Sequence, residues 1–188
     1  GDIYAQISFS VGTENKSASK SLPSVFMLLY HMNFGYPLLS PQSRLVVRSD
    51  AVRGADETAQ AEIDQYASFH EPMHLRDERC YFHDLHADAD GSVCIALVND
   101  SLELGAVLHF NKNELPCLTE WKMLAEGEYV LGLEPGNTNP IGRLAAKERG
   151  TLQYLQPGEI RQTHIELEIL DGGAAIRQAE QEIGGESI

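Results

Sequence analysis

Apolar and polar residues alternate in short runs along much of this chain, and turn residues separate the runs. Residues 3–11 and residues 161–170 alternate clearly, which predicts two half-buried strands. Residues 25–31 form a more continuous apolar run, which predicts a second, more deeply buried strand, and residues 44–49 predict a short third one. Strand patterns do not alternate with helical ones, and turn signals recur roughly every 8–12 residues. The pattern favours an all-β chain folded as an antiparallel β-sandwich.

Turn chemistry adds detail to this expectation. Asp90-Gly91 lies between strand-like residues 79–87 and 92–98, and this dipeptide is typical of a type I′ β-hairpin. Helical patterns are short. One lies around residues 58–66, within an irregular loop segment, and residues 174–183 predict a C-terminal helix. Residues 12–21 and 154–159 are predicted turns, and further strands are predicted at residues 106–111, 118–124 and 127–134.

Length and charge limit the class of protein. The 188 residues predict a single domain spanning 1–188, and 43% apolar with 22% charged residues is ordinary for a globular chain. The formal net charge is −14, which disfavours partners with phosphate backbones or anionic membranes. No apolar run approaches the 18–20 residues of a membrane span. A small neutral ligand is a better match, and exposed sheet edges would allow a homo-oligomer.

Neither a metal nor a cofactor is predicted. Cys80, Cys94 and Cys117 are odd in number and form no C-x-x-C pair, so we expect a cytoplasmic protein without disulfides. His70 with His74, and His83 with His86, do not match a zinc signature in their spacing. Phosphate-loop, dinucleotide and nucleophile-elbow motifs are also missing from the sequence.

The first candidate site residues come at the end of an apolar run. His31 and Asn33 are two residues apart, so their side chains share one face of an extended backbone, just before the turn at Gly35 to Pro37. A lone histidine is more often structural, bonded to backbone. A polar pair at an accessible sheet end also suits a small-molecule site.

A second segment repeats this arrangement with a carboxylate. Glu134 follows the apolar residues 129–133 and precedes Pro135-Gly136, while Asn137 can hydrogen-bond ligand hydroxyls. Partial burial raises the pKa of a carboxyl and makes it a better base, although a strand-end salt bridge is the simpler interpretation. Trp121, the only tryptophan, is either a packing residue or a platform for a sugar ring. His83 is a further candidate for reaching the ligand.

These segments resemble a known family. Residues 30–37, YHMNFGYP, resemble the histidine-bearing strand of aldose 1-epimerases (galactose mutarotases), and residues 132–137, GLEPGN, resemble the strand with their catalytic glutamate. Residues 78–85, 115–122 and 155–159 are similar to segments of a poorly characterised, mutarotase-like bacterial branch. The resemblance covers nearly the whole chain and implies a mutarotase-like β-sandwich that binds a hexose or related aldose.

The resemblance also implies site roles. Glu134 would be the catalytic base and His31 the acid, while Asn33, Glu78, His83, Trp121 and Asn137 would bind the sugar. Family members are longer, and their N-terminal part supplies a second histidine and an arginine to the site. No such segment precedes Ile3, so we expect this chain, which resembles their C-terminal portion, to be either a C-terminal fragment or a truncated relative with an incomplete site.

Two other functions stay open. A non-catalytic carbohydrate-binding module on the same fold would bind sugar without accelerating anomer exchange. A glycosidase-like enzyme would need two carboxylates facing one bond, and Glu78 would have to be the partner of Glu134.

Overall fold

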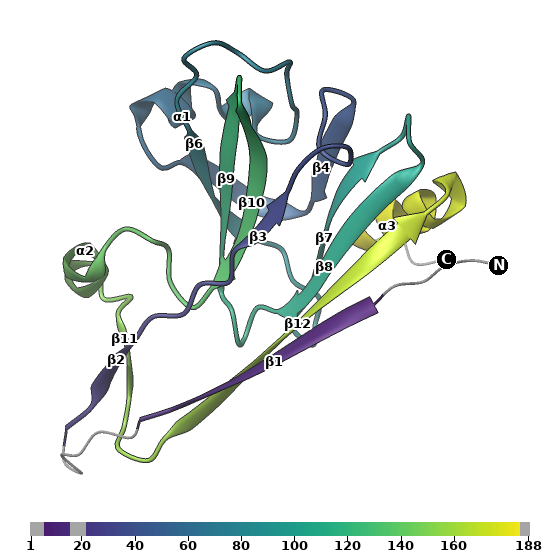
Figure 1. Ribbon diagram of the computed structural model, residues 1–188. Helices are drawn as coiled ribbons and strands as arrows, with labels where there is room; N and C mark the ends of the chain where they lie inside the picture. Colours follow the sequence, from purple (N-terminus) through teal and green to yellow (C-terminus); the bar gives the residue numbers. More distant parts are fainter. Residues whose placement is uncertain (1–5, 16–21, 185–188) are drawn as a thin grey trace.

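The computed structural model describes residues 6–15 and 22–184, and strands dominate it (Figure 1). Two five-stranded antiparallel sheets and one two-stranded sheet hold all twelve strands of the described chain. The first sheet has the order β1-β12-β8-β7-β4, with β1 Gln6–Glu14, β12 Ile160–Asp171, β8 Leu104–Asn111, β7 Ser92–Asn99 and β4 Ser43–Val47. The second has the order β3-β10-β9-β6-β5, with β3 Met32–Phe34, β10 Glu128–Gly136, β9 Cys117–Ala125, β6 Arg79–Leu85 and β5 Ser49–Gly54. The small sheet pairs β2 Ser24–Phe26 with β11 Gln153–Leu155.

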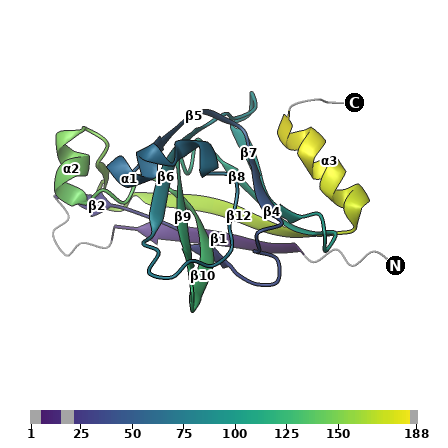
Figure 2. The same cartoon turned by 90° about the horizontal axis from the view of Figure 1, so that it is seen from above.

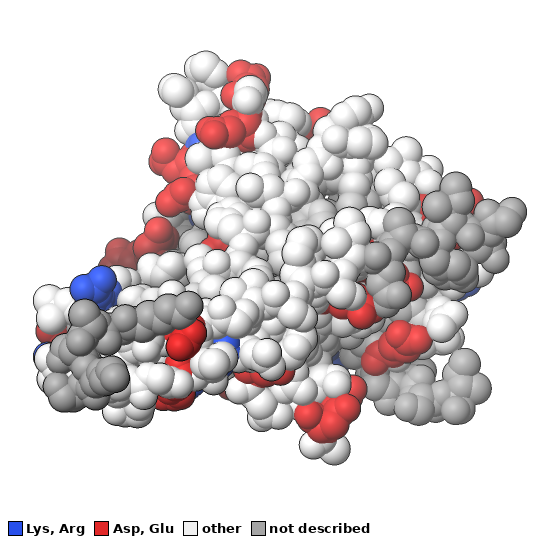
Figure 3. Space-filling view, turned by 60° about the horizontal axis from the view of Figure 1, so that its bottom comes forward, with Lys and Arg blue, Asp and Glu red and all other residues white. Residues whose placement is uncertain are grey.

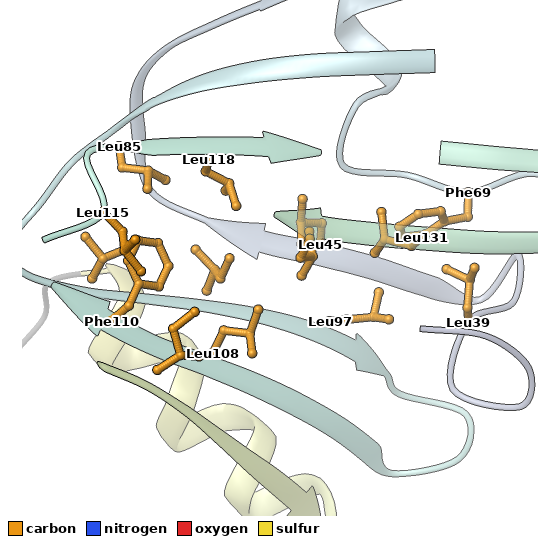
Figure 4. Close-up of a cluster of buried hydrophobic side chains, with 14 of the residues drawn as sticks. Leu39, Leu45, Phe69, Leu85, Leu97, Leu108, Phe110, Leu115, Leu118 and Leu131 are labelled. Carbon is orange, nitrogen blue, oxygen red and sulfur yellow. The ribbon is translucent and has the colours of Figure 1, made fainter. Parts of the chain in front are cut away.

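The two large sheets pack face to face around the main core (Figure 4). Apolar residues at every second position of the central strands point into this space, as the alternating pattern requires, whereas Ile7, Phe9 and Val11 of β1 are exposed. The most deeply buried members come from both sheets and the connecting loops: Leu39, Leu85, Ile95, Leu97, Leu108, Leu115, Leu118, Leu131, Leu133 and Ile165. Burial of this apolar surface is the main source of stability. The expected antiparallel β-sandwich is confirmed.

The helices are short and lie outside this core (Figure 2). Helix α3, Gly173–Gly184, packs on the outer face of the first sheet, where Ile176, Ala179 and Ile183 meet Val98 and Val107. The predicted C-terminal helix is thereby confirmed. Helix α1, Glu57–Ala61, and the 3₁₀ turn η1, Ile63–Gln65, match the helical piece predicted at residues 58–66. Helix α2, Arg143–Glu148, was not predicted.

The hairpin predicted around Asp90-Gly91 is wrong. The turn itself is present, with Gly91 at φ 88°. However, β6 and β7 lie in different sheets, because β6 is already paired with β5 and β9, and β7 with β4 and β8. The dipeptide therefore joins the two layers of the sandwich.

Two predictions near the N-terminal end also change. The strand expected at residues 3–11 is observed as β1, Gln6–Glu14, so Gly12 to Glu14 are strand and not turn; residues 3–5 and 16–21 lie outside the described part of the chain. Of the strand expected at 25–31, only residues 25–26 are strand, in β2. The chain then leaves β11, makes a single bridge from Leu29 to Gly136, and pairs with β10 only from Met32, where β3 begins.

Candidate active site

The candidate site lies on the face of the second sheet that points away from the core. Leu131 and Leu133 of β10 point inward, so Gly132 and Glu134 point to the opposite face. Gly132 is paired with Asn33 of β3 on one side and with Trp121 of β9 on the other. Strand register thus brings residues from three separate segments onto one face.

His31 and Glu134 form a direct pair. His31 Nε2 lies 2.9 Å from Glu134 Oε1, a hydrogen-bond distance. The histidine side chain is 44% exposed and the glutamate side chain 6%. One partner therefore faces solvent, while the other is largely removed from it, which is a suitable arrangement for exchanging protons with a bound molecule.

Gly132 leaves the space that this pair occupies. A Cβ atom at position 132 would lie 2.9 Å from His31 Cε1, 3.1 Å from Glu134 Oε1 and 3.3 Å from Trp121 Cε3. Any larger residue would have to displace these side chains. Sequence reasoning missed this role, although a glycine inside an apolar strand is a signal for a close approach.

Trp121 and Glu78 complete the cluster. The Trp121 Nε1–H group donates a hydrogen bond to Glu78 Oε2 at 2.7 Å. The indole packs edge-on against the His31 ring, with 5.8 Å between ring centroids and 67° between ring planes. The indole is part-exposed on the site face, so it is not a core residue. A carboxylate thus orients the indole, and the indole borders the imidazole.

The electrostatics favour a base at Glu134. Burial raises the pKa of the Glu134 carboxyl above its usual value; His31 opposes the rise, and the nearby Glu78 carboxylate adds to it. Burial also raises the pKa of the neighbouring Cys80 thiol to about 12, with contributions from Glu134 and Glu78. Cys80, which sits opposite Trp121 in the register, is therefore protonated at neutral pH and is not a nucleophile.

The structure brings some of the predicted residues together and not others. His31, Asn33, Glu78, Trp121 and Glu134 share one face of the sheet or its border. Asn33 is exposed there and free to meet a ligand.

Asn137 and His83 lie elsewhere. Asn137 is buried and bonded to backbone: its Oδ1 accepts from Leu28 N–H at 2.7 Å, and its Nδ2 donates to Phe26 O at 3.0 Å. It fixes the segment that changes strand partners. His83 points to the opposite, core-facing side of the sheet, where Nε2 lies 3.0 Å from Glu120 Oε2.

Other kinds of site find no support in the described residues. Residues 6–15 and 22–184 contain no group of three or more His, Cys, Asp or Glu side chains placed to hold a metal ion. Within the same ranges, no helix is both long and apolar enough to cross a membrane.

Comparisons with solved structures define the class of fold. A "putative aldose 1-epimerase" from Klebsiella pneumoniae superposes with a TM-score of 0.90 at 25% identity, covering 96% of this chain and 47% of that one. A "galactose mutarotase related enzyme" from Lactobacillus acidophilus gives a TM-score of 0.60 at 12% identity, with 89% and 58% coverage. This chain therefore has the mutarotase-like fold, and it spans about half the length of these structures.

The sequence comparison gives the family. The chain belongs to the family described as "Domain of unknown function (DUF4432)", whose model matches residues 6–169. No curated protein matches the sequence. The resemblance to aldose 1-epimerases stated from the motifs is thus confirmed by the structural likeness.

Proposed function

We propose that this protein interconverts the α and β anomers of an aldose sugar. The observation that carries the proposal is the His31–Glu134 pair: an acid and a base 2.9 Å apart on an accessible sheet face. The structural likeness to a "putative aldose 1-epimerase" supports it. Because this chain spans about half of that structure, the activity and the substrate are part of the proposal.

The pair has the two groups that mutarotation requires. The Glu134 carboxylate takes the proton of the anomeric hydroxyl, while protonated His31 donates its proton to the ring oxygen. The bond between the anomeric carbon and the ring oxygen breaks, and an open-chain aldehyde forms. After rotation about the adjacent carbon–carbon bond, the hydroxyl formed from the ring oxygen attacks the other face of the aldehyde. Each proton then returns to the group that it came from.

Neighbouring residues suit the binding of a sugar. The exposed amide of Asn33 can hydrogen-bond a hydroxyl, and the part-exposed Trp121 ring offers an apolar surface for the C–H face of a pyranose. Glu78 already accepts the indole N–H, so its first role is to hold Trp121. That partner makes Glu78 a weaker candidate for the second carboxylate of a glycosidase.

Anomer exchange tests this function directly. NMR exchange measurements on a panel of aldoses should show faster α/β exchange with the 188-residue chain than in buffer. Glu134→Gln and His31→Gln should each slow the catalysed exchange by about 10²–10⁴-fold. Glu128→Gln, which alters an exposed carboxylate at the start of the same strand, serves as the matched control.

Two results would contradict the proposal. Unchanged exchange rates in Glu134→Gln would remove the assigned base. Sugar binding with no acceleration by the unaltered chain would instead identify a non-catalytic carbohydrate-binding module.

A further inference from the structure

A cavity lies near the end of β10, two residues along that strand from Glu134. It has a volume of about 460 Å³ and is bounded by the start of β9, the residues that follow β10 and the loop after α2. Its lining includes Cys117, Thr138, Asn139 and Thr151. The volume falls in the range of small-molecule sites.

The charge of this cavity is opposite to that of the chain. Two arginines, Arg53 and Arg149, are among its lining residues, and the described lining residues include no aspartate or glutamate. The whole chain has 28 acidic and only 14 basic residues. Figure 3 shows this imbalance on one face, where carboxylates far outnumber Lys and Arg groups. The other described cavity with basic residues is lined by Arg76, Arg79 and Lys122 but also contains Glu62, so basic residues without a carboxylate distinguish this cavity.

Most other described cations are already paired with carboxylates. Ion pairs are formed by Arg44, Arg76, Arg79, Lys112, Lys122 and Arg161. Arg53 instead stacks on an aromatic ring, its guanidinium carbon 4.4 Å from the centroid of the Phe82 ring. A stacked guanidinium keeps its in-plane N–H groups free, and their planar fork matches a phosphate or a carboxylate.

The strand register connects the cavity to the acid–base pair. Glu134 is paired with Thr119, Thr119 with Phe82, and Phe82 with Arg53, so these four residues form one row on the site face. Three strand spacings separate the backbones of Glu134 and Arg53, or roughly 14 Å. Both side chains are long, which shortens the gap that a ligand has to span. Two residues beyond Glu134, Gly136 is paired with Cys117 of the cavity lining.

Two polar atoms in this region have no partner within the described residues. Asn139 Oδ1 belongs to the cavity lining, and Thr119 Oγ1 belongs to the row between Glu134 and Arg53; both are buried without a hydrogen bond. Leaving a buried polar group unpaired costs stability, so each such atom calls for an explanation, such as a bound water or ion.

We propose that the cavity lined by Arg53 and Arg149 binds an anionic group of the substrate, carried at the end remote from the anomeric carbon. The substrate class is then an aldose that bears a phosphate or a carboxylate. This inference rests on the proposed function, because it places the anomeric carbon at His31 and Glu134.

Kinetics with matched sugars test the substrate class. Anomer exchange is measured for a hexose, its 6-phosphate and its uronate, with the unaltered chain and with Arg53→Gln, Arg149→Gln and Arg48→Gln. Arg48 is an exposed arginine outside the cavity and serves as the control. We expect a KM at least tenfold lower for one of the two anionic sugars than for the hexose. Arg53→Gln and Arg149→Gln should each raise that KM by about tenfold, and Arg48→Gln should not. The anionic sugar that shows the gain identifies the phosphate or the carboxylate.

Calorimetry separates this inference from the proposed function. Inorganic phosphate and the hexose 6-phosphate are titrated into Glu134→Gln, which retains both arginines. Binding that weakens about tenfold on adding Arg53→Gln supports the anion site even if no sugar is anomerised, an outcome that would overturn the proposed function alone. Equal KM values for all three sugars, with neutral hexose turned over, would overturn the anion site alone. Binding unaffected by either arginine substitution would also overturn it.

Discussion

The second sheet carries two histidine–glutamate pairs, one on each face. His31 and Glu134 are 2.9 Å apart on the outer face, and His83 and Glu120 are 3.0 Å apart on the face toward the core. The first histidine is 44% exposed, whereas both side chains of the second pair are 0% exposed. The two pairs have the same residue types at nearly the same distance. Access to a ligand is therefore what distinguishes the candidate active site from a buried structural pair.

The surroundings of the sealed pair explain its role. Ser49 Oγ lies 3.0 Å from His83 Nδ1, and the Tyr66 ring packs edge-on against His83. Lys122 Nζ lies 3.9 Å from Glu120 and donates to the backbone carbonyls of residues 65, 66 and 68 at 2.8 Å each. The pair thus belongs to a polar network that holds the chain segment between β5 and β6 against the sheet.

Removing the buried glutamate should have the largest effect on stability. Glu120→Ala leaves His83 Nε2 and the Lys122 ammonium without their carboxylate, at a cost of about 3–5 kcal/mol in the free energy of unfolding. Glu134→Gln should change that free energy by less than about 1 kcal/mol, since it removes a largely desolvated charge and keeps a hydrogen-bonding group. Urea unfolding of both variants measures the difference. Equal losses would mean that the outer pair is also structural.

The outer pair can be disturbed without touching its titratable groups. Gly132→Ala places a methyl group 2.9 Å from His31 Cε1 and should force His31 and Glu134 out of position. A displacement of about 1 Å can cost about 10²-fold in rate, so we expect kcat/KM for anomer exchange to fall by that order. Gly12→Ala is the control, because a Cβ there meets nothing within 4 Å. Full activity in Gly132→Ala would argue against the assigned geometry.

The segment between β5 and β6, which covers the buried His83–Glu120 pair, should unfold locally at low pH. The guanidinium groups of Arg76 and Arg79 hydrogen-bond Glu62 and lower its pKa to about 2. A lowered folded-state pKa adds stability that is present above the unfolded value of 4.5 and is lost as the pH falls toward 2. Glu62→Gln should therefore lower the free energy of unfolding by about 1–3 kcal/mol at pH 7. Below pH 4.5, the free energy of unfolding of this variant should fall less steeply with decreasing pH than that of the unaltered chain.

Unfolding curves between pH 7 and pH 2 test this, and hydrogen exchange at residues 57–78 locates the change. Glu128→Gln, on an exposed strand end, is the matched control. If the free energy of unfolding falls as steeply at low pH in Glu62→Gln as in the unaltered chain, other carboxylates are responsible for the loss of stability.

The smallest effect concerns the tuning of the base. Because the pKa of Glu134 is raised, its acid limb in the pH profile of kcat/KM should lie above pH 4.5. The Glu78 carboxylate contributes to this rise, so Glu78→Gln should move the limb to lower pH, while Glu128→Gln leaves it in place. A limb that stays fixed in Glu78→Gln would show that Glu78 does not contribute to the raised pKa of Glu134.

The local pattern of apolar and polar residues was enough to predict the strands that bury one face. Alternation in β12 and the apolar runs of β9 and β10 predicted these strands, because residues two apart must share a face whatever their neighbours. The pattern failed where pairing was decided at long range. Asp90-Gly91 has the chemistry of a hairpin turn, but the neighbours of β6 and β7 were already fixed by other strands. The run at residues 25–31 was split because it meets two different partners.

The amino-acid sequence alone determined the antiparallel sandwich, the shared face of His31 and Asn33, and the partial burial of Glu134, since all three follow from alternation along single strands. Only the tertiary structure decided that His31 meets Glu134, that His83 faces the core and that Asn137 bonds to backbone. The same long-range pairing of strands placed Arg53 and Arg149 in one cavity. Strand register and layer packing set these contacts, and they depend on residues far apart in the chain.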